Sequence, residues 1–217
     1  MEIIRLQVGP IGANCYLVAS VRTGQALVID PGDEPDRILA ALRSRDLAVG
    51  AVVLTHYHFD HVGAAAAIQQ ETDAPLCIGA GDAAALENPP ALFGLTGPAG
   101  LRADTRLHQG DLVAFGELAL TVLETPGHTA GGISLYGEGH DVLFSGDTLF
   151  RRGIGRTDLP GGSTSTLQDS IRNRLYALPA QTVVHPGHGE ATTIGEEQRE
   201  NPFVRLQGAP HGAGAGA

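Results

Sequence analysis

Residues 55–61, Thr-His-Tyr-His-Phe-Asp-His, are the stretch that decides the fold of this chain. They follow the apolar segment Ala51–Thr55, which is typical of a buried strand, and they lead into a helix. Imidazole nitrogens and carboxylate oxygens are the ligands that zinc and similar first-row metals prefer. Alternate residues of an extended loop point to the same side, so His56 and His58 can face one metal. Asp60 and His61, around the turn into the helix, can face a second.

Three later positions repeat one pattern, in which an apolar strand is followed by glycine and then by a histidine or an aspartate: His128, Asp147 and His188. Glycine lets the backbone turn sharply and bring a short side chain to the end of a strand. Alone, each of these residues is an ordinary loop residue, but together with the cluster they complete a set of metal ligands. The sequence therefore predicts a metal centre built from the ends of several strands.

Short β-branched segments between Gly, Pro and Asp turns predict strands, and apolar residues at helical spacing predict helices. The predicted strands are Glu2–Val8, Asn14–Ala19, Ala26–Asp30, Ala51–Thr55, Pro75–Ile78, Leu112–Phe115, Leu118–Leu123, Ile133–Tyr136, Val142–Ser145 and Thr182–His185. The predicted helices are Glu34–Arg45, His61–Glu71, Ala80–Leu86 and one from the N-cap Ser163 to Ala177. This order favours two sheets packed face to face with helices outside.

The chain has 217 residues, 42% of them hydrophobic, with 24 acidic and 14 basic side chains and a net charge of −10. This apolar content excludes a disordered acidic chain. All the basic side chains are arginines, so lysine-based catalysis is excluded, and the negative charge disfavours nucleic acid and anionic membranes as partners. No targeting segment or apolar run of about 20 residues is visible, so a cytoplasmic enzyme is expected.

We expect one domain over residues 1–207 and a flexible Gly/Ala tail over residues 208–217. The Pro/Gly-rich loop Glu87–Asp104 is a candidate lid or rim. Cys15 and Cys77 lie inside apolar runs, so they are expected to be reduced core residues.

The seven candidate ligands, in this order and with these neighbours, resemble those of the metallo-β-lactamase superfamily, and more closely its glyoxalase II-like (hydroxyacylglutathione hydrolase-like) branch. The similarity covers nearly the whole chain. Besides the ligands, it is carried by Asn14-Cys15-Tyr16, Asp30-Pro31-Gly32, Thr125–Thr129, Ser145–Leu149, Gly155–Ser163, Thr193-Ile194-Gly195 and Asn201-Pro202-Phe203. The stretches from Ser145 onward narrow the resemblance to that branch.

The resemblance implies an α+β fold, a four-layer αβ/βα sandwich of two mixed sheets flanked by helices, with the site at one edge between the sheets. It also implies the ligand sets of two metals: His56, His58 and His128 for the first, Asp60, His61 and His188 for the second, with Asp147 bridging both. Two divalent ions are therefore expected. Zinc is the first expectation, although imidazole and carboxylate also suit iron and manganese.

The expected function is hydrolysis of a thioester of a small thiol. Two metals about 3.5–4 Å apart can hold a bridging hydroxide at neutral pH and polarise a carbonyl. In this hypothesis the hydroxide attacks the thioester carbonyl. Asp60 orients the hydroxide, and Asp147 binds both metals. The expected partner is a small-molecule acyl-thiol ester, and the sequence does not predict an oligomeric state.

Other residues carry weaker signals. Asp30 is expected to organise the ligand loops rather than to bind metal. Arg156 either orients the substrate or pairs with Asp158. Tyr57 and Phe59 alternate with the ligands, so they are expected to point away from the metals and either to pack in the core or to line the substrate pocket. The remaining histidines are expected to be solvated, as for His108, His140 and His211, or structural, as for His185.

The resemblance also has limits. Full-length glyoxalase II enzymes carry a helical C-terminal domain whose basic residues supply much of the glutathione site, whereas this chain stops soon after Asn201-Pro202-Phe203 and has no lysine. The chemistry is thus better supported than the thiol carrier. A mononuclear iron persulfide dioxygenase and a lactonase remain alternatives, both less consistent with Gly155–Ser163. A dizinc β-lactamase would use a cysteine ligand, and neither cysteine lies near a ligand loop. A non-enzymatic metal-binding or structural protein is a further alternative, but it would leave a complete dinuclear metal site without a catalytic function.

Overall fold

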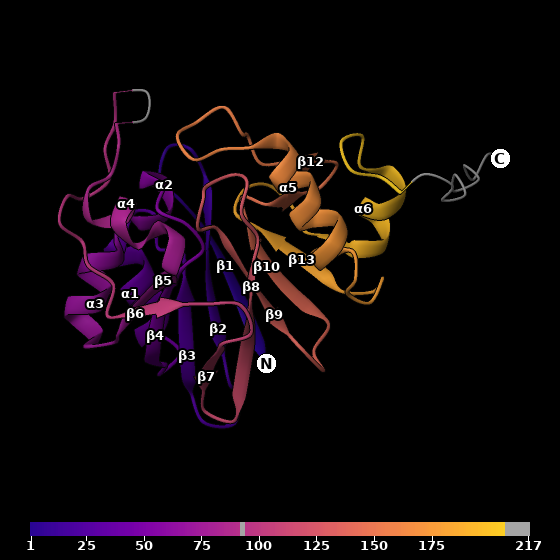
Figure 1. The fold of residues 1–217 in the computed structure, drawn as a ribbon. Coiled ribbons are helices and arrows are strands. Elements are labelled where there is room, and N and C mark those ends of the chain that lie inside the picture. The colour runs from indigo at the N-terminus through magenta and orange to yellow at the C-terminus, as the bar shows by residue number, and fades with distance from the viewer. Residues whose placement is uncertain (92–93, 207–217) are drawn as a thin grey trace.

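Two six-stranded sheets form the centre of the computed structural model, which describes residues 1–91 and 94–206 (Figure 1). The first sheet runs in chain order: β1 (Glu2–Val8), β2 (Ala13–Ala19), β3 (Gln25–Ile29), β4 (Ala48–Leu54), β5 (Leu76–Gly79) and β6 (Thr105–Leu107). Strands β1 to β3 pair antiparallel and β3 to β6 pair parallel, so the sheet is mixed.

The second sheet has the order β14-β13-β10-β9-β8-β7. Its strands are β7 (Leu112–Phe115), β8 (Leu118–Glu124), β9 (Ile133–Gly137), β10 (Val142–Gly146), β13 (Val183–Pro186) and β14 (Thr192–Thr193). Strands β10 and β13 pair parallel and the other neighbours pair antiparallel, which makes this sheet mixed as well. A small ribbon of β11 (Leu149–Phe150) and β12 (Gly153–Ile154) follows β10.

Helices cover the outer face of each sheet, as Figure 1 shows. On the first sheet these are α1 (Pro35–Arg43), α2 (Phe59–Val62), α3 (Ala65–Thr72), the 3-10 turn η1 (Ala80–Asp82) and α4 (Ala83–Glu87). On the second sheet they are α5 (Thr164–Ser170), its continuation η2 (Ile171–Leu175) and α6 (Ile194–Glu200). The four-layer αβ/βα sandwich expected from the sequence is confirmed.

The alternation of side chains along the strands explains this layering. In β2 every residue is buried: Leu17 packs toward the helices of the first sheet, and Val18 packs between the two sheets. In β10, Phe144 faces the space between the sheets and Leu143 faces α5. Successive side chains of a strand point to opposite faces, so a strand covered on both sides needs a continuous apolar sequence.

Two predicted helices differ from the observed ones. The helix expected over His61–Glu71 is divided into α2 and α3 at Gly63, because the turn at Pro31-Gly32 packs there and the Pro31 carbonyl accepts a hydrogen bond from the Ala64 amide (2.9 Å). The helix after Ser163 begins as predicted, since the Ser163 hydroxyl accepts a hydrogen bond from the Thr166 amide (3.3 Å), but its last turns are a π-helix. The prediction also missed the short strands β6, β11, β12 and β14 and the helix α6.

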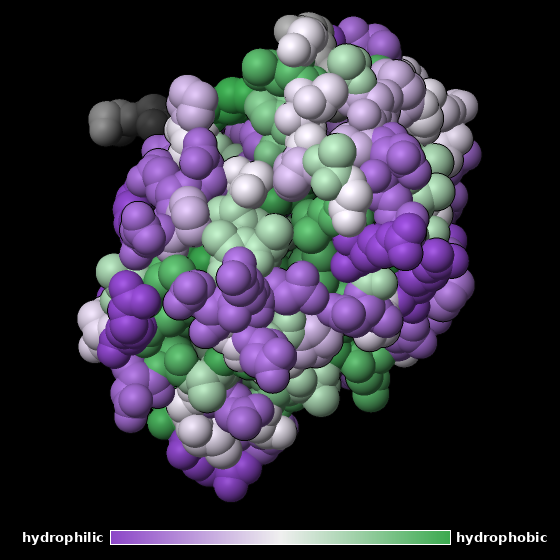
Figure 2. Space-filling view, turned by 90° about the vertical axis from the view of Figure 1, so that its left-hand side faces the viewer, coloured by the Kyte–Doolittle hydropathy of each residue, from purple (hydrophilic) through white to green (hydrophobic). Residues whose placement is uncertain are grey.

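Other expectations concern the surface and the ends of the chain. Both cysteines are buried and unpaired, as predicted. The predicted tail, residues 208–217, lies outside the described residues. Within residues 1–91 and 94–206, no helix combines the length and apolar character needed to cross a membrane. Figure 2 shows the face that carries α3 and α4, where hydrophilic side chains divide the hydrophobic surface into separate patches.

Candidate metal centre

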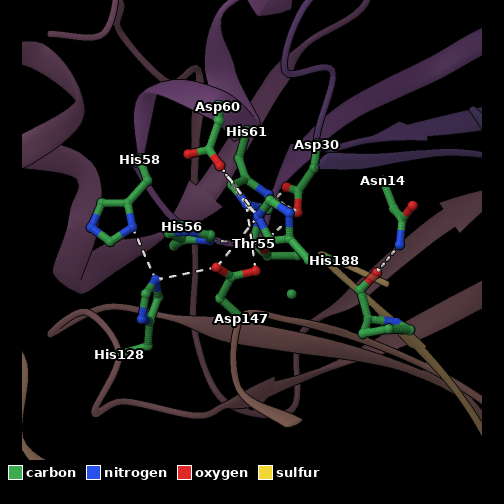
Figure 3. Close-up of polar contacts among 12 residues, drawn as sticks. Asn14, Asp30, Thr55, His56, His58, Asp60, His61, His128, Asp147 and His188 are labelled. Atoms are coloured by element: carbon green, nitrogen blue, oxygen red, sulfur yellow. Dashed lines mark hydrogen bonds and ion pairs between the residues drawn. The ribbon is translucent and has the colours of Figure 1, made fainter. Parts of the chain in front are cut away.

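The structure brings all seven predicted ligands together at one edge of the two sheets (Figure 3). His56 and His58 follow the end of β4, and Asp60 and His61 lie on α2. The other three ligands follow the ends of β8, β10 and β13 in the second sheet: His128, Asp147 and His188. Both sheets therefore contribute to the site, which lies where the resemblance places it.

The first group of ligands consists of His56, His58 and His128. One ring nitrogen of each lies within 4.8 Å of the others, and all three side chains are buried. The Nε2 atom of His128 is 2.9 Å from Nδ1 of His58. Three imidazoles that converge so closely form a set suited to one first-row metal ion.

The second group consists of Asp60, His61 and His188, whose ligand atoms also lie within 4.8 Å of one another. The Nε2 atom of His188 is 3.2 Å from Oδ2 of Asp60 and 3.2 Å from Nε2 of His61. A carboxylate oxygen and two imidazole nitrogens are again suitable ligands for such an ion.

Asp147 lies between the two groups. Its Oδ2 atom is 3.6 Å from Nε2 of His128 and 3.7 Å from Nε2 of His188, and its Oδ1 atom is 3.5 Å from Nε2 of His61. One carboxylate thus reaches a histidine of the first group and two of the second. This is the geometry expected of a bridging ligand.

Unpaired buried atoms support the presence of a metal. Among the described residues, neither Nε2 of His56 nor Oδ1 of Asp147 has a hydrogen-bond partner, although both atoms are buried. Buried polar atoms are nearly always paired, because an unpaired one loses its hydration without compensation. Both residues lie among the other candidate ligands in Figure 3, so bound metal ions would satisfy these atoms.

Hydrogen bonds at Nδ1 set the tautomers of three histidines. The Thr55 hydroxyl donates to Oδ2 of Asp30 (2.6 Å), so Nδ1 of His56, 3.0 Å from the same hydroxyl oxygen, must be the donor. Nδ1 of His61 likewise donates to Oδ2 of Asp30 (3.0 Å), and Nδ1 of His128 donates to the Arg156 carbonyl (2.7 Å). In each case Nε2 is the nitrogen left to face the site, as a metal ligand requires.

The ionisation of the ligands follows from burial and neighbouring charge. Burial, together with the neighbouring histidines, lowers the pKa of His56 well below its usual value and that of His58 to about 3. Burial also lowers the pKa of His61, but the carboxylates of Asp147, Asp30 and Asp60 outweigh it and raise the pKa to about 10. The first group therefore holds neutral imidazoles, ready to bind metal. The carboxylates that raise the pKa of His61 would equally favour a divalent cation in the second group, and metal binding would displace the proton from Nε2.

Asp30 holds the start of the ligand loop in place. Its Oδ1 accepts a hydrogen bond from the Thr55 amide (2.7 Å), while Oδ2 accepts from the Thr55 hydroxyl and from His61. Asp30 is also near enough to His56 and His61 to count as a third ligand group. However, both of its oxygens are engaged by Thr55 and by the far nitrogen of His61. This geometry agrees with the expected role of organising the ligand loops.

The segment Asn14-Cys15-Tyr16 anchors the loop that carries His188. The side-chain amide of Asn14 donates to the carbonyls of Pro186 and Gly189 (2.9 Å each), on either side of His188. The Tyr16 hydroxyl donates to the Pro186 carbonyl as well (2.7 Å). Figure 3 shows Asn14 reaching this backbone from β2. These contacts give the family-like segment a physical role that its sequence alone did not reveal.

Glycine precedes the ligands because neighbouring groups occupy the space of a side chain. A Cβ atom on Gly187 would lie 2.2 Å from Oδ1 of Asp147, and one on Gly146 would lie 2.4 Å from the Thr55 hydroxyl. Gly146 also has a positive φ of 49°. Both positions thus require glycine for the ligand loops to approach one another.

Asp82 links two ligand loops and was missed by the sequence analysis. It is 1% exposed, and it accepts hydrogen bonds from the Thr129 hydroxyl (2.7 Å), the Gly131 amide (2.6 Å) and the backbone of Tyr57. Burial raises the pKa of Asp82 to about 6, against these hydrogen bonds. Tyr57 stands between His56 and His58. No motif marks Asp82 in the sequence, because its partners are distant along the chain.

A cavity of about 240 Å³ opens over the ligands and shows where the expected substrate contacts lie. Phe59, Arg156 and Leu159 line it together with five of the ligands. Arg156 is also paired with Asp158 through two hydrogen bonds of 2.8 Å. Tyr57 does not line this cavity: it packs in the core, 4% exposed, and its hydroxyl donates to the Pro160 carbonyl (3.2 Å). Of the two aromatic residues, only Phe59 can contact a substrate here.

The remaining histidines lie away from the ligands. His185 stacks on Phe144 at a centroid distance of 5.2 Å, and burial lowers its pKa to about 4, which fits the structural role expected. His108 and His140 are exposed, as predicted. His211 lies outside the described residues.

Comparisons with known proteins agree with this geometry. Residues 8–188 match the model of the metallo-beta-lactamase superfamily. The chain is 39% identical to the probable metallo-hydrolase YqgX of Bacillus subtilis, over 92% of this chain and 96% of the relative. It is 35% identical to the hydroxyacylglutathione hydrolase GloC of Haemophilus influenzae, over 93% of this chain and 98% of the relative.

Solved structures lead to the same family. The BLEG-1 B3 metallo-beta-lactamase superposes with a TM-score of 0.89 at 36% identity, covering 94% of this chain and 99% of that one. ETHE1 from Myxococcus xanthus superposes with a TM-score of 0.80 at 35% identity, covering 94% of this chain and 84% of that one. TTHA1623, solved in a di-iron-bound form, superposes with a TM-score of 0.83 at 39% identity, covering 93% of this chain and 100% of that one. From its sequence, its fold and its cluster of His and Asp side chains, the chain belongs to the metallo-beta-lactamase superfamily.

Proposed function

We propose that this protein is a hydrolase that cleaves the thioester of a small thiol with the help of two divalent metal ions. The observation that carries the proposal is the position of Asp147, whose carboxylate reaches both groups of histidines. Such a dinuclear site supplies a hydroxide nucleophile at neutral pH and polarises a carbonyl when both ions are bound. The similarity to the hydroxyacylglutathione hydrolase GloC supports a thioester as the substrate.

The chain's own groups fit this role. His188 and His61 hold the pKa of Asp60 below its usual value, although burial opposes them, so its carboxylate is ionised at neutral pH. Asp60 lines the cavity and can accept a hydrogen bond from a nucleophile, which orients it. Phe59 and Leu159 add apolar side chains to the wall of the cavity that the ligands line.

The two ligand groups fit zinc, iron and manganese alike, because all three bind imidazole and carboxylate. We propose zinc as the resident metal, while the di-iron-bound form of TTHA1623 shows that a similar protein accepts iron. Elemental analysis of the purified protein tests this directly. Two zinc ions per chain are expected.

A second candidate is a mononuclear iron persulfide dioxygenase. The chain is 35% identical both to GloC and to the ETHE1 structure, so identity does not choose between the branches. The group of His56, His58 and His128 is a complete ligand set without the second group.

One experiment separates these two candidates. The protein is assayed with a panel of acyl-thiol esters, with a lactone, and with a persulfide in an oxygen electrode, and its metal content is measured in the same sample. Thioester turnover with two metals per chain supports the hydrolase. One iron per chain with persulfide-dependent oxygen consumption would overturn it.

A further inference from the structure

A second cavity of about 280 Å³ adjoins the cavity over the metal ligands, and we call it the side cavity. It lies between the β1–β2 turn, the Gly32-Asp33 turn, the start of α2 and the segment 95–98. The two cavities share Ile11, Phe59 and Asp60 in their walls. A molecule bound at the metal ligands can therefore extend past Phe59 into the side cavity.

The walls of the side cavity are mainly apolar. Their large side chains are Val8, Pro10, Ile11, Phe59, Leu95 and Pro98. Ile11 and Leu95 are each 52% exposed, which is unusual for large hydrophobic residues. Exposed hydrophobic side chains that gather at the mouth of a cavity beside an active site indicate a binding surface for an apolar group.

The charged groups of this cavity disfavour an anionic ligand. Asp33 and Asp60 contribute carboxylates, and neither arginine nor histidine occurs among the described residues that line it. In the neighbouring cavity Arg156 is already paired with Asp158. Asp60 is expected to bind the second metal ion, which offsets its charge, but the carboxylate of Asp33 would repel a carboxylate of a carrier such as glutathione.

We propose that the side cavity binds an uncharged, apolar arm of the thioester substrate. The inference rests on the proposed thioester hydrolysis and adds the class of substrate: a thioester whose one arm carries no carboxylate. With about 280 Å³, the cavity is large enough for a short alkyl chain. The arm is either the acyl chain or the thiol carrier, and the two are distinguished by experiment.

The first experiment measures binding, so its result does not depend on hydrolysis. Isothermal titration calorimetry compares two stable thioethers with the zinc-loaded full chain: S-hexyl-N-acetylcysteamine, which is neutral on both arms, and S-(5-carboxypentyl)glutathione, which carries carboxylates on both arms. Whichever arm enters the side cavity, we expect the neutral thioether to bind at least tenfold more tightly. Equal or tighter binding of S-(5-carboxypentyl)glutathione would overturn the proposal.

Variants locate the binding site. A Cβ atom on Gly97 would lie 3.4 Å from Val62 and 3.7 Å from Phe59, so G97A fits without strain and G97L fills the cavity. L95D adds a third carboxylate at its mouth. We expect G97L and L95D to weaken binding of the neutral thioether about tenfold, whereas G97A changes it less than threefold. L112D is the matched control, because Leu112 is 67% exposed on β7 and lines neither cavity. Equal effects of L95D and L112D would contradict the proposal.

Turnover then identifies which arm enters. One series lengthens the acyl chain on N-acetylcysteamine from acetyl to hexanoyl, and the other lengthens an S-alkyl group on an acetyl thioester. We expect kcat/KM to rise up to about fourfold per methylene in one series, until the cavity is full, and this rise to be lost in G97L. Selective binding without turnover would refute the thioester hydrolase alone. Turnover that is independent of chain length in both series would refute the side cavity alone.

Discussion

Oδ2 of Asp30 lies 3.0 Å from Nδ1 of His61, and both side chains are almost completely buried. The carboxylate fixes the tautomer of the imidazole, so that Nε2 faces Asp60, Asp147 and His188. An aspartate that need not touch a metal thus determines whether a neighbouring histidine can.

Replacing Asp30 by asparagine should weaken the second metal site. An amide cannot accept all three hydrogen bonds that Thr55 and His61 donate, so His61 loses its fixed orientation. We expect the affinity for the second metal to fall about 10- to 100-fold, with a smaller change at the first. Competition titration with a zinc chelator measures both steps, and D36N on the exposed first turn of α1 is the control. Two unchanged binding steps in D30N would show that Asp30 does not act through His61.

Replacing Asp147 by alanine should remove most of the bound metal and most of the activity. This change takes away the carboxylate that lies between the two groups, within 3.7 Å of Nε2 of His61, His128 and His188. We expect at most one metal per chain and a fall in kcat of at least about 100-fold for any substrate that the wild type hydrolyses. Metal content and turnover are measured on the same preparation. D169A, on the exposed face of α5, should retain both metals, and full turnover by D147A with two metals would disprove the bridging role.

The free energy of unfolding should depend on pH through Asp82. Its pKa is about 6 in the folded protein and 3.8 in the absence of structure, so the native state binds more protons between these values. The contribution of Asp82 to the free energy of unfolding is therefore greatest below about pH 4, and it falls by roughly 2–3 kcal/mol as the pH rises through 6.

The variant D82N isolates this contribution. Its side-chain amide can accept from the Gly131 amide and donate to the Thr129 hydroxyl, while the titration is removed. Any loss of the hydrogen bond from the Tyr57 backbone lowers the free energy of unfolding equally at every pH, so the pH dependence alone is compared. Urea unfolding of the two metal-free proteins at pH 4, 5, 6 and 7 measures the difference in their pH profiles. Parallel profiles would mean that Asp82 does not titrate in this range.

Replacing Gly63 by alanine should destabilise the protein. A Cβ atom there would lie 2.3 Å from the Gly32 carbonyl oxygen, so α2 or the Pro31-Gly32 turn would have to move. We expect a loss of about 1–3 kcal/mol in unfolding free energy and weaker binding of the second metal, since His61 lies on α2. G50A is the matched control, because its nearest contact is 3.7 Å away. Thermal unfolding with and without zinc compares the two, and equal melting temperatures would show that the turn adapts.

Local patterns predicted much of the fold. The apolar runs of β2, β4 and β10 and the helical spacing of Ile38, Leu39 and Leu42 are signals between near neighbours, and all appear in the structure as expected. The break at Gly63 and the link from Asp82 were not predictable in this way. Both depend on backbone from other parts of the chain, namely Gly32 and Gly131.

The sequence by itself determined the chemistry of the site: the seven ligand types, their order, and their place at the ends of strands, because these follow from residue identity and short-range geometry. Only the tertiary structure decided which nitrogen of His56, His61 and His128 faces the site. It also decided that Phe59 lines a cavity while Tyr57 is buried, and that an apolar space extends from the site. The reason is physical: tautomers and cavities are set by distances between groups far apart in the chain, which only packing establishes.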